Sequence, residues 1–355
     1  MRVVGRRETL LNRRKLIQAV TCVWLLSGCA FSQPPTPGAQ LIPDDPGEAI
    51  WADISEGPMR VLISEGDADL YLLQDLEPHG RVVIMDRETR RVLHRIPVGR
   101  RPIAMAVEGA TGYVADYLSD DVTVVDLKAA EAVKTIPVGR RPIRVATADN
   151  IPYVLVTNHG SDTISVIDKK SLTVTRTLAV PRRPGDMAIH PDGRFAYVLH
   201  RGAAELSVLN LHTLRFVQRI PIGEFPSGIA VSMDGRRLFV SDAVTDTLHV
   251  IETETLRVVQ TIAVGKQPIE VMRVSSRDEV YVLAGASREV RVIDPLTRET
   301  ISIIPLPYPP RCMTATSDGG QLYISYGQAV GEMTVVEMAG RKPVRSYTVP
   351  GPGIA

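Results

Sequence analysis

Four charged side chains that occupy one position of a sequence repeat are the first candidates for chemistry. Arg60, Arg144, Asp186 and Glu270 each lie two residues after a proline that recurs about every 42 residues. The following residue is apolar in every unit, so alternation along a strand turns the charged side chains the other way, toward the middle of the array. Because an isolated buried charge is costly, they either neutralise one another as ion pairs or form the floor of a polar pocket.

Arginine pairs in the turn before this proline form the second candidate set. The pairs are Arg100 and Arg101, Arg140 and Arg141, and Arg182 and Arg183. Other units have Glu224, Lys266 or Tyr308 in this turn, so the positive charge is confined to one arc. Guanidinium groups suit carboxylates and phosphates. With Arg60 and Arg144, the arc is expected to bind an anionic ligand or partner, unless these arginines are merely solvated turn residues.

Two histidines complete the candidate residues. His159 and His200 are predicted to occupy corresponding loops of neighbouring units, and with Glu270 and Asp186 they are the weak candidates for acid–base catalysis. Neither histidine has a carboxylate or a third histidine at metal-ligand spacing, and no nucleophile elbow or phosphate loop occurs. The sequence therefore predicts no metal and no cofactor, and it leans away from an enzyme.

The elements that must position these residues follow from the repeat. The segment Ile-Pro-Val-Gly-Arg-Arg-Pro at 96–102 recurs at 136–142, and marker prolines stand at 58, 102, 142, 184, 226, 268 and 310. Each unit contains four short segments with strand periodicity. A period near 42 residues with four strands predicts an all-β, seven-bladed β-propeller with four antiparallel strands per blade over residues 50–355.

Turn chemistry within the units adds two expectations. The third strand of each unit ends at a residue that can close a turn with its side chain: Asp86, Asp126, Asp168, Asn210, Glu252, Asp294 and Glu337. The two glutamates are expected to close a looser turn. The link from strand four to strand one and the loop from strand two to strand three are expected to share one face, called the top face below.

The first 49 residues are predicted to target the chain rather than to fold with it. Residues 1–28 combine a basic start with a short apolar segment, which is typical of a cleaved export signal, by the Sec or the twin-arginine route. Leu26-Ser27-Gly28-Cys29 resembles the lipobox of bacterial lipoproteins, which implies lipidation of Cys29 and, with Ala30 next, the outer membrane. Residues 29–49 are rich in proline and are expected to form a tether.

Charge and cysteine content narrow the class of partner. The full chain has a formal charge of +1, and removal of residues 1–28 leaves 35 basic and 39 acidic side chains, a net charge of −4. A mildly acidic protein gains little from neutralising phosphates, which counts against general nucleic-acid binding. Once Cys22 is removed and Cys29 is lipidated, Cys312 remains alone, so no disulfide is expected.

Several repeat segments also carry a family resemblance. The Ile-Pro-Val-Gly-Arg-Arg-Pro turn, Tyr-Val-Leu-Val-Thr-Asn at 153–158 and the segment 161–168 resemble the repeats of the YVTN, or YncE-like, family of seven-bladed β-propellers over roughly residues 55–350. The resemblance implies an exported protein of the bacterial envelope. Some relatives are similar to propellers that contact DNA, and others accompany quinoprotein oxidation systems, so the fold does not define the function.

Three functions are consistent with these features. The leading hypothesis is a monomeric, non-catalytic recognition or scaffold module, lipid-anchored in the envelope, whose top face binds a protein or an anionic ligand. The alternative is a lactonase- or lyase-like enzyme with a polar site at the mouth of the axial channel. The third is weak nucleic-acid binding through the arginine arc, where Phe225 is the only aromatic residue noted beside the arginines.

Overall fold

The computed structural model describes residues 58–348 apart from 77, 278 and 327–331, within a compact unit that spans Gly47–Ala355. The predicted signal at 1–28, Cys29 and the tether at 29–49 lie outside the described residues. Across the described ranges we find no helix that is both long and apolar enough to span a bilayer. A single 3-10 turn, η1 (Ser275–Arg277), is the helical element in these ranges.

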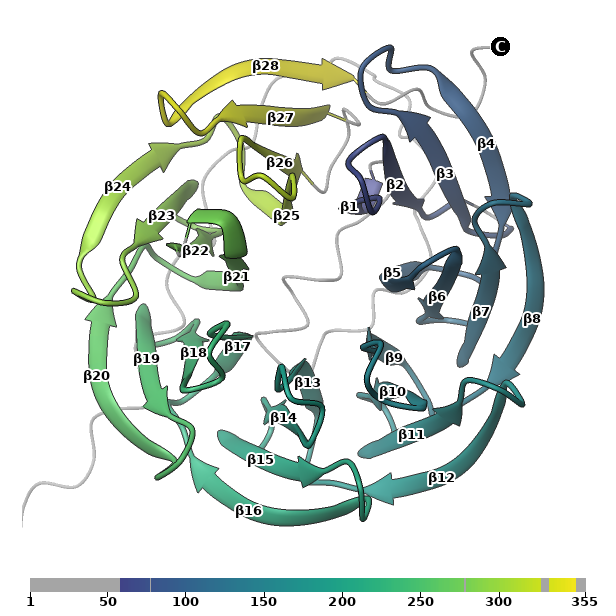
Figure 1. Cartoon of the computed structure of the whole chain (residues 1–355), viewed down its shortest axis with the longest axis horizontal. Helices are drawn as coiled ribbons and strands as arrows, with labels where there is room; N and C mark the ends of the chain where they lie inside the picture. The colour runs from purple at the N-terminus through teal and green to yellow at the C-terminus, as the bar shows by residue number, and fades with distance from the viewer. Residues whose placement is uncertain (1–57, 77, 278, 327–331, 349–355) are drawn as a thin grey trace, which may run out of the picture. The chain divides into compact units, whose positions relative to one another are not determined.

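The described strands form seven four-stranded antiparallel sheets, which surround a central axis as blades (Figure 1). The innermost strands are β1 (Pro58–Ile63), β5 (Pro102–Glu108), β9 (Pro142–Ala146), β13 (Pro184–Ile189), β17 (Pro226–Val231), β21 (Pro268–Val274) and β25 (Pro310–Ala315). The second strands are β2 (Asp69–Gln74), β6 (Thr111–Asp116), β10 (Tyr153–Asn158), β14 (Phe195–His200), β18 (Arg237–Asp242), β22 (Glu279–Ala284) and β26 (Gln321–Tyr326). Every marker proline is thus the first residue of a blade, which confirms the predicted fold.

The outer half of each blade completes the sheet. The third strands are β3 (Arg81–Asp86), β7 (Asp121–Asp126), β11 (Thr163–Asp168), β15 (Glu205–Asn210), β19 (Thr247–Glu252), β23 (Glu289–Ile293) and β27 (Glu332–Glu337). The outermost strands are β4 (Val92–Pro97), β8 (Glu131–Pro137), β12 (Thr173–Ala179), β16 (Arg215–Pro221), β20 (Arg257–Ala263), β24 (Thr300–Pro305) and β28 (Lys342–Thr348). Blade 1 is β1–β4, and blade 7 is β25–β28.

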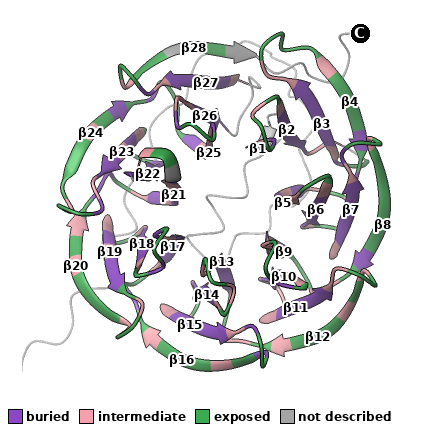
Figure 2. Cartoon of the chain, viewed as in Figure 1, coloured by how far each residue is buried: buried purple, intermediate pink, exposed green. Residues whose placement is uncertain are grey.

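The hydrophobic core lies between neighbouring blades. The second and third strands are buried along most of their length, whereas the outermost strands are largely exposed (Figure 2). One cluster joins Val124 of blade 2 to Val145 and Val156 of blade 3. The residue three positions after each marker proline is buried in all seven blades, as predicted: Val61, Met105, Val145, Met187, Ile229, Val271 and Met313. Each blade therefore covers the apolar face of the next.

The turn after the third strand has the predicted side-chain closure in blades 1 to 6. Asp168 Oδ1 accepts hydrogen bonds from the backbone N–H groups of Lys170 (3.1 Å) and Ser171 (2.8 Å). At Glu252 the carboxylate instead accepts from the Thr255 hydroxyl at 2.9 Å, and Glu337 accepts from a side-chain amide at 2.8 Å. The Glu252 contact confirms the looser closure expected there. The donor to Glu337 is Gln321 on the paired strand β26, so the described contacts do not show the closure expected at Glu337.

The ring closes without a strand exchanged between the first and last blades. Strand β1 pairs with β2, and β28 pairs with β27, so each described blade is contiguous in sequence. Side chains join the two ends: the Asp67 carboxylate accepts from Ser317, and Arg87 Nη1 donates to Gln321 Oε1 at 2.8 Å. The Cys312 Sγ atom also accepts a hydrogen bond from the Val61 N–H at 3.1 Å.

The links and loops of the top face are joined by backbone hydrogen bonds. The N–H of Tyr117 donates to the Arg101 carbonyl at 3.0 Å, and that of His159 donates to the Arg141 carbonyl at 3.0 Å. This confirms that the β4–β5 type of link and the β6–β7 type of loop share one face. The glycine of the Val-Gly turn permits this approach, because a Cβ atom on Gly139 would lie 2.7 Å from the Cβ atom of Asn158.

Candidate functional site

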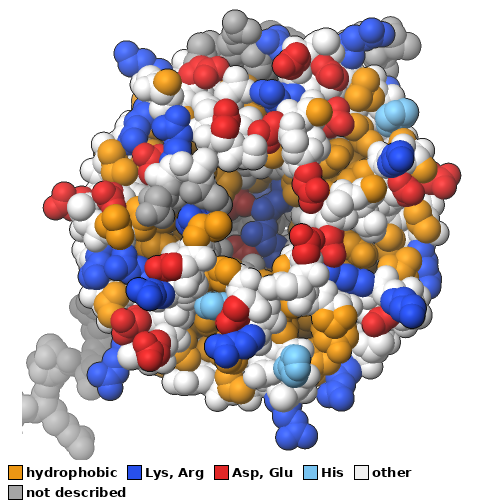
Figure 3. Space-filling model, in the orientation of Figure 1, with side chains coloured by type: hydrophobic (Ala, Val, Ile, Leu, Met, Phe, Trp, Pro, Cys, Tyr) orange, Lys and Arg blue, Asp and Glu red, His pale blue; other side chains and the backbone are white. Residues whose placement is uncertain are grey.

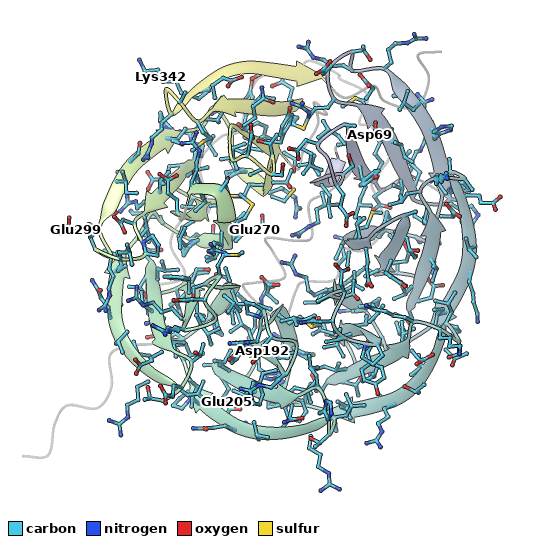
Figure 4. All side chains as sticks on the ribbon, viewed as in Figure 1. Asp69, Asp192, Glu205, Glu270, Glu299 and Lys342 are labelled. Atoms are coloured by element: carbon cyan, nitrogen blue, oxygen red, sulfur yellow. The ribbon has the colours of Figure 1, made fainter. Side chains whose placement is uncertain are left out.

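The axial channel contains the four charged residues of the repeat position. Figure 3 shows the ring hollowed at its centre, with basic and acidic side chains inside, and Figure 4 shows Glu270 beside this opening. Arg60 Nη2 on β1 lies 2.6 Å from Glu270 Oε1 on β21, and Arg144 Nε on β9 lies 2.5 Å from Asp186 Oδ1 on β13. Of the two alternatives for these residues, the structure shows the ion pairs.

The channel carboxylates also connect consecutive blades. Glu270 Oε2 accepts a hydrogen bond from the Met313 N–H at 2.9 Å, and Asp186 Oδ2 accepts one from the Ile229 N–H at 3.3 Å. The Cys312 thiol repeats this contact with Val61 across the ring closure. In each case, the side chain two residues after a marker proline binds the backbone three residues after the next one. These side chains hold neighbouring innermost strands together.

Electrostatics in the channel reflect burial and pairing. Burial is the largest single effect on Arg60 and would lower its pKa, but the electrostatic attraction of Glu270, Cys312 and Asp186 and the hydrogen bond to Glu270 together outweigh it, so the pKa is raised. At Arg144 burial dominates over the attraction of Asp186, and its pKa is lowered. Burial, with the charge of Glu270, raises the pKa of the Cys312 thiol, which is free and buried. The four titratable charges cancel, and the thiol is neutral.

The arginine arc, defined as Arg100, Arg101, Arg140, Arg141, Arg182 and Arg183, lies in the links of blades 2, 3 and 4. The second residue of each pair has a left-handed backbone, with φ of 56°, 50° and 55°. Asp120 Oδ1 accepts the Arg141 N–H at 2.7 Å, and Asp162 Oδ1 accepts the Arg183 N–H at 2.7 Å. The loop carboxylates thus fix the backbone of the link in the next blade.

Aromatic and exposed groups give the arc its chemical character. The guanidinium carbon atoms of Arg101 and Arg141 lie 5.2 and 5.8 Å from the centroid of the Tyr117 ring, within cation–π distance. Arg100, Arg140 and Arg182, the first residue of each pair, are exposed. Tyr117 was missed at the level of sequence, although it directly follows β6 as His159 follows β10. An alignment of the second-strand ends could have found it.

The two candidate histidines do not occupy equivalent positions, and this prediction is wrong. His159 follows β10, whereas His200 is the last residue of β14 and corresponds to Asn158. His200 is fully buried, and burial, together with the charge of Arg219, lowers its pKa to about 4. His159 is half-buried, with Nδ1 3.3 Å from the Pro184 carbonyl oxygen. A one-residue offset on a strand reverses the direction of a side chain, and this separates the two rings.

Metal-binding chemistry has no support in the part of the chain that the structure describes. There, no group of three or more His, Cys, Asp or Glu side chains is placed to hold a metal ion. The chemistry that the described residues offer is recognition of negative charge at the arc and charge pairing in the channel.

Comparisons with known proteins identify the type of fold. The family model for the YNCE-like β-propeller matches residues 79–278, whereas no curated protein matches the chain. Among solved structures, the chain is similar to a chain of Kuenenia stuttgartiensis hydrazine synthase, with 19% identity and a TM-score of 0.72, covering 86% of this chain and 99% of that one. A putative 6-phosphogluconolactonase from Bacteroides uniformis is 18% identical with a TM-score of 0.62, covering 73% and 89%. At such identities, the likeness shows the fold alone.

Proposed function

The chain belongs to the YNCE-like β-propeller family, and on that premise we propose that it is a non-catalytic recognition module whose top face binds a negatively charged group of a ligand or partner protein. The observation that carries this proposal is the exposure of Arg100, Arg140 and Arg182 on three adjacent blades. Guanidinium groups match carboxylates and phosphates in geometry and charge, and the fixed backbone of the links means that binding needs to order the side chains alone.

The channel geometry supports recognition over the lactonase- or lyase-like alternative. A general acid or base must reach the substrate with a proton-transfer site. Asp186 and Glu270 are each engaged by an arginine and by the backbone N–H of the next blade. Their role in joining the innermost strands explains why carboxylates occupy these positions without invoking catalysis.

The predicted attachment to the envelope remains part of this proposal. Lipidation of Cys29 and the tether at 29–49 would hold the propeller at the membrane, with its top face available to a periplasmic or surface partner. Metabolic labelling with palmitate in a bacterial host is expected to mark the wild-type chain and not the Cys29→Ser variant. Equal labelling of both would contradict the anchor.

Binding by the arc is tested with a short polyglutamate peptide as the acidic probe, measured by calorimetry. The variant Arg100→Glu/Arg140→Glu/Arg182→Glu is expected to lose at least about tenfold in affinity, or about 1.4 kcal/mol. The matched control reverses three exposed arginines of the outermost strands and has the same net charge: Arg176→Glu/Arg215→Glu/Arg257→Glu. An equal loss in the control would attribute binding to overall charge and overturn the proposal.

A salt titration with a single-stranded oligonucleotide separates the third function from the first. The Tyr117 ring lies between two arginines, and nucleic-acid bases stack on such aromatic rings. This arrangement is the structural reason for testing nucleic-acid binding. The affinity for nucleic acid would fall steeply as the salt concentration rises. The slope of the logarithm of the binding constant against the logarithm of the salt concentration gives the number of phosphates that the protein neutralises. A slope near zero would dispose of this alternative.

A further inference from the structure

Two aspartates face one another at the base of a top-face loop in blade 2. Asp116, the last residue of β6, is the Cα partner of Asp121, the first residue of β7, and the loop 117–120 lies between them. Asp116 is fully buried and Asp121 is half-buried. The same rung pairs Asn158 with Thr163 in blade 3. Four other blades have one carboxylate or none at this rung, with the pairs Gln74 and Arg81, His200 and Glu205, Asp242 and Thr247, and Ala284 and Glu289.

The hydrogen bonds around this pair leave one place for a proton. Asp116 Oδ2 accepts a hydrogen bond from the Thr123 hydroxyl at 2.6 Å. The Oδ1 atoms of Asp116 and Asp121 are both buried, and neither has a hydrogen-bond partner. A buried carboxylate oxygen without a donor is costly, and two facing carboxylates repel. One proton retained by the pair removes both costs.

The loop above the pair connects it to the arginine arc. Leu118 and Ser119 accept hydrogen bonds from the side chain and the N–H of Arg100, at 2.8 and 2.7 Å. In the same loop, the Tyr117 ring lies beside Arg101 and Arg141, and Asp120 holds the backbone of Arg141. The position of residues 117–120 thus determines how arginines of two blades are presented.

We infer that Asp116 and Asp121 share one proton at neutral pH, and that loss of this proton weakens anion binding at the arginine arc. The second half of this inference rests on the function proposed above. The ionised pair would place two like charges on the last rung of the hairpin and loosen the loop that supports the arginines. Anion binding and proton binding then favour one another reciprocally.

The charged surroundings agree with a retained proton. Burial raises the pKa of Asp116 to about 8, against the Thr123 hydrogen bond and with the help of the Asp121 charge. Burial also raises the pKa of Asp121, with Asp120 adding to the effect and Arg100 opposing it. On the strands that flank the pair, β5 and β8 place the uncharged Pro102 and Pro137 opposite the two aspartates. Arg101, Arg140 and Arg141 are the other charged groups of the adjoining links.

The variant Asp116→Asn/Asp121→Thr tests the shared proton, because it copies Asn158 and Thr163 of blade 3, which hydrogen-bond at 3.1 Å. A folded-state pKa above the unfolded value means that the native state binds more protons, so stability falls as pH rises from about 4 to about 8. Urea unfolding of the full propeller should show this loss in the wild type and a smaller one in the variant. Identical pH profiles would overturn the shared proton. This readout needs no ligand.

The effect of this proton on anion binding is tested with an N-terminally acetylated polyglutamate probe, which has no group that titrates between pH 7 and 9. Wild-type affinity is expected to fall about fivefold over this range, the low end of typical coupling, while the variant changes little. An equal decrease in peptide affinity in both proteins would contradict the coupling between this proton and anion binding at the arc. Absence of peptide binding at every pH would overturn the proposed function and the control together, while the unfolding profile would still decide on the proton.

Discussion

The axial channel and the arginine arc both gather charge from several blades, but they use it differently. In the channel, the partly buried Arg60 pairs with the buried Glu270, and the carboxylate also binds the next blade. In the arc, Arg100 and Arg140 are exposed, and the nearby loop carboxylate of Asp120 is engaged with backbone. Charge at a repeated position therefore indicates function only after its partners are known. The channel carboxylates join blades, whereas Arg100 and Arg140 of the arc are exposed to solvent.

The largest effect that tests this contrast is expected at Glu270. The Glu270→Ala variant leaves the partly buried Arg60 without its carboxylate partner and the Met313 N–H without an acceptor. Removing one member of a buried ion pair destabilises by about 3–5 kcal/mol. Urea unfolding measures the loss, and the double variant Arg60→Met/Glu270→Leu should recover part of it. A destabilisation below about 1 kcal/mol would mean that the channel charges do not join the blades.

The second effect concerns His200, which lies beneath the arc and is buried. Its pKa of about 4 is below the unfolded value, so its stabilising contribution is complete above about pH 6.5 and is lost as the pH falls through 4. Acidification should therefore cost up to about 3 kcal/mol. The His200→Asn variant, which copies Asn158, should lose less between pH 7 and 4.5 in urea unfolding. The His159→Gln control should behave as the wild type does.

A smaller effect is expected at the ring closure. The Cys312→Val variant leaves the buried Val61 N–H without its acceptor, which costs about 1–3 kcal/mol. The Cys312→Ser variant keeps an acceptor and should be destabilised less. Thermal unfolding of both proteins measures the difference. Equal stability of the two variants would show that the sulfur contributes packing and not a hydrogen bond.

The smallest effect on stability is expected in the arc. Replacing the exposed Arg100, Arg140 and Arg182 with glutamine should change the free energy of unfolding by about 0.5 kcal/mol or less per residue. Peptide binding should be lost in the same variant. A large destabilisation would remove the distinction between the two regions, because it would make the arc a structural feature like the channel.

Most of the fold was predictable from the sequence, because the same pattern of strands and turns occurs in seven repeat units. Each marker proline begins an innermost strand, and Asp168 closes the turn expected of it. The site was predictable only in part. The apolar residue beside each channel charge indicated which way Asp186 and Glu270 point. The cost of buried charge made ion pairing one of two expectations, and the structure shows the pairs.

Other features of the site depend on contacts that the repeat does not encode. The His200 ring is buried because it ends a strand that His159 follows, and a shift of one residue reverses a side chain's direction. Tyr117 meets Arg141 across a blade boundary, 24 positions further along the sequence. Such neighbours are set by the curvature of the ring and the direction of each loop.

The sequence by itself determined the number of blades, their strand order and the residues at each turn, because these depend on local backbone preference and on a period repeated seven times. Only the tertiary structure decided which charges are paired in the channel, which arginines remain exposed, and that Asp116 faces Asp121. The physical reason is that the free energy of a charge depends on its burial and its partners, and both are properties of the closed ring.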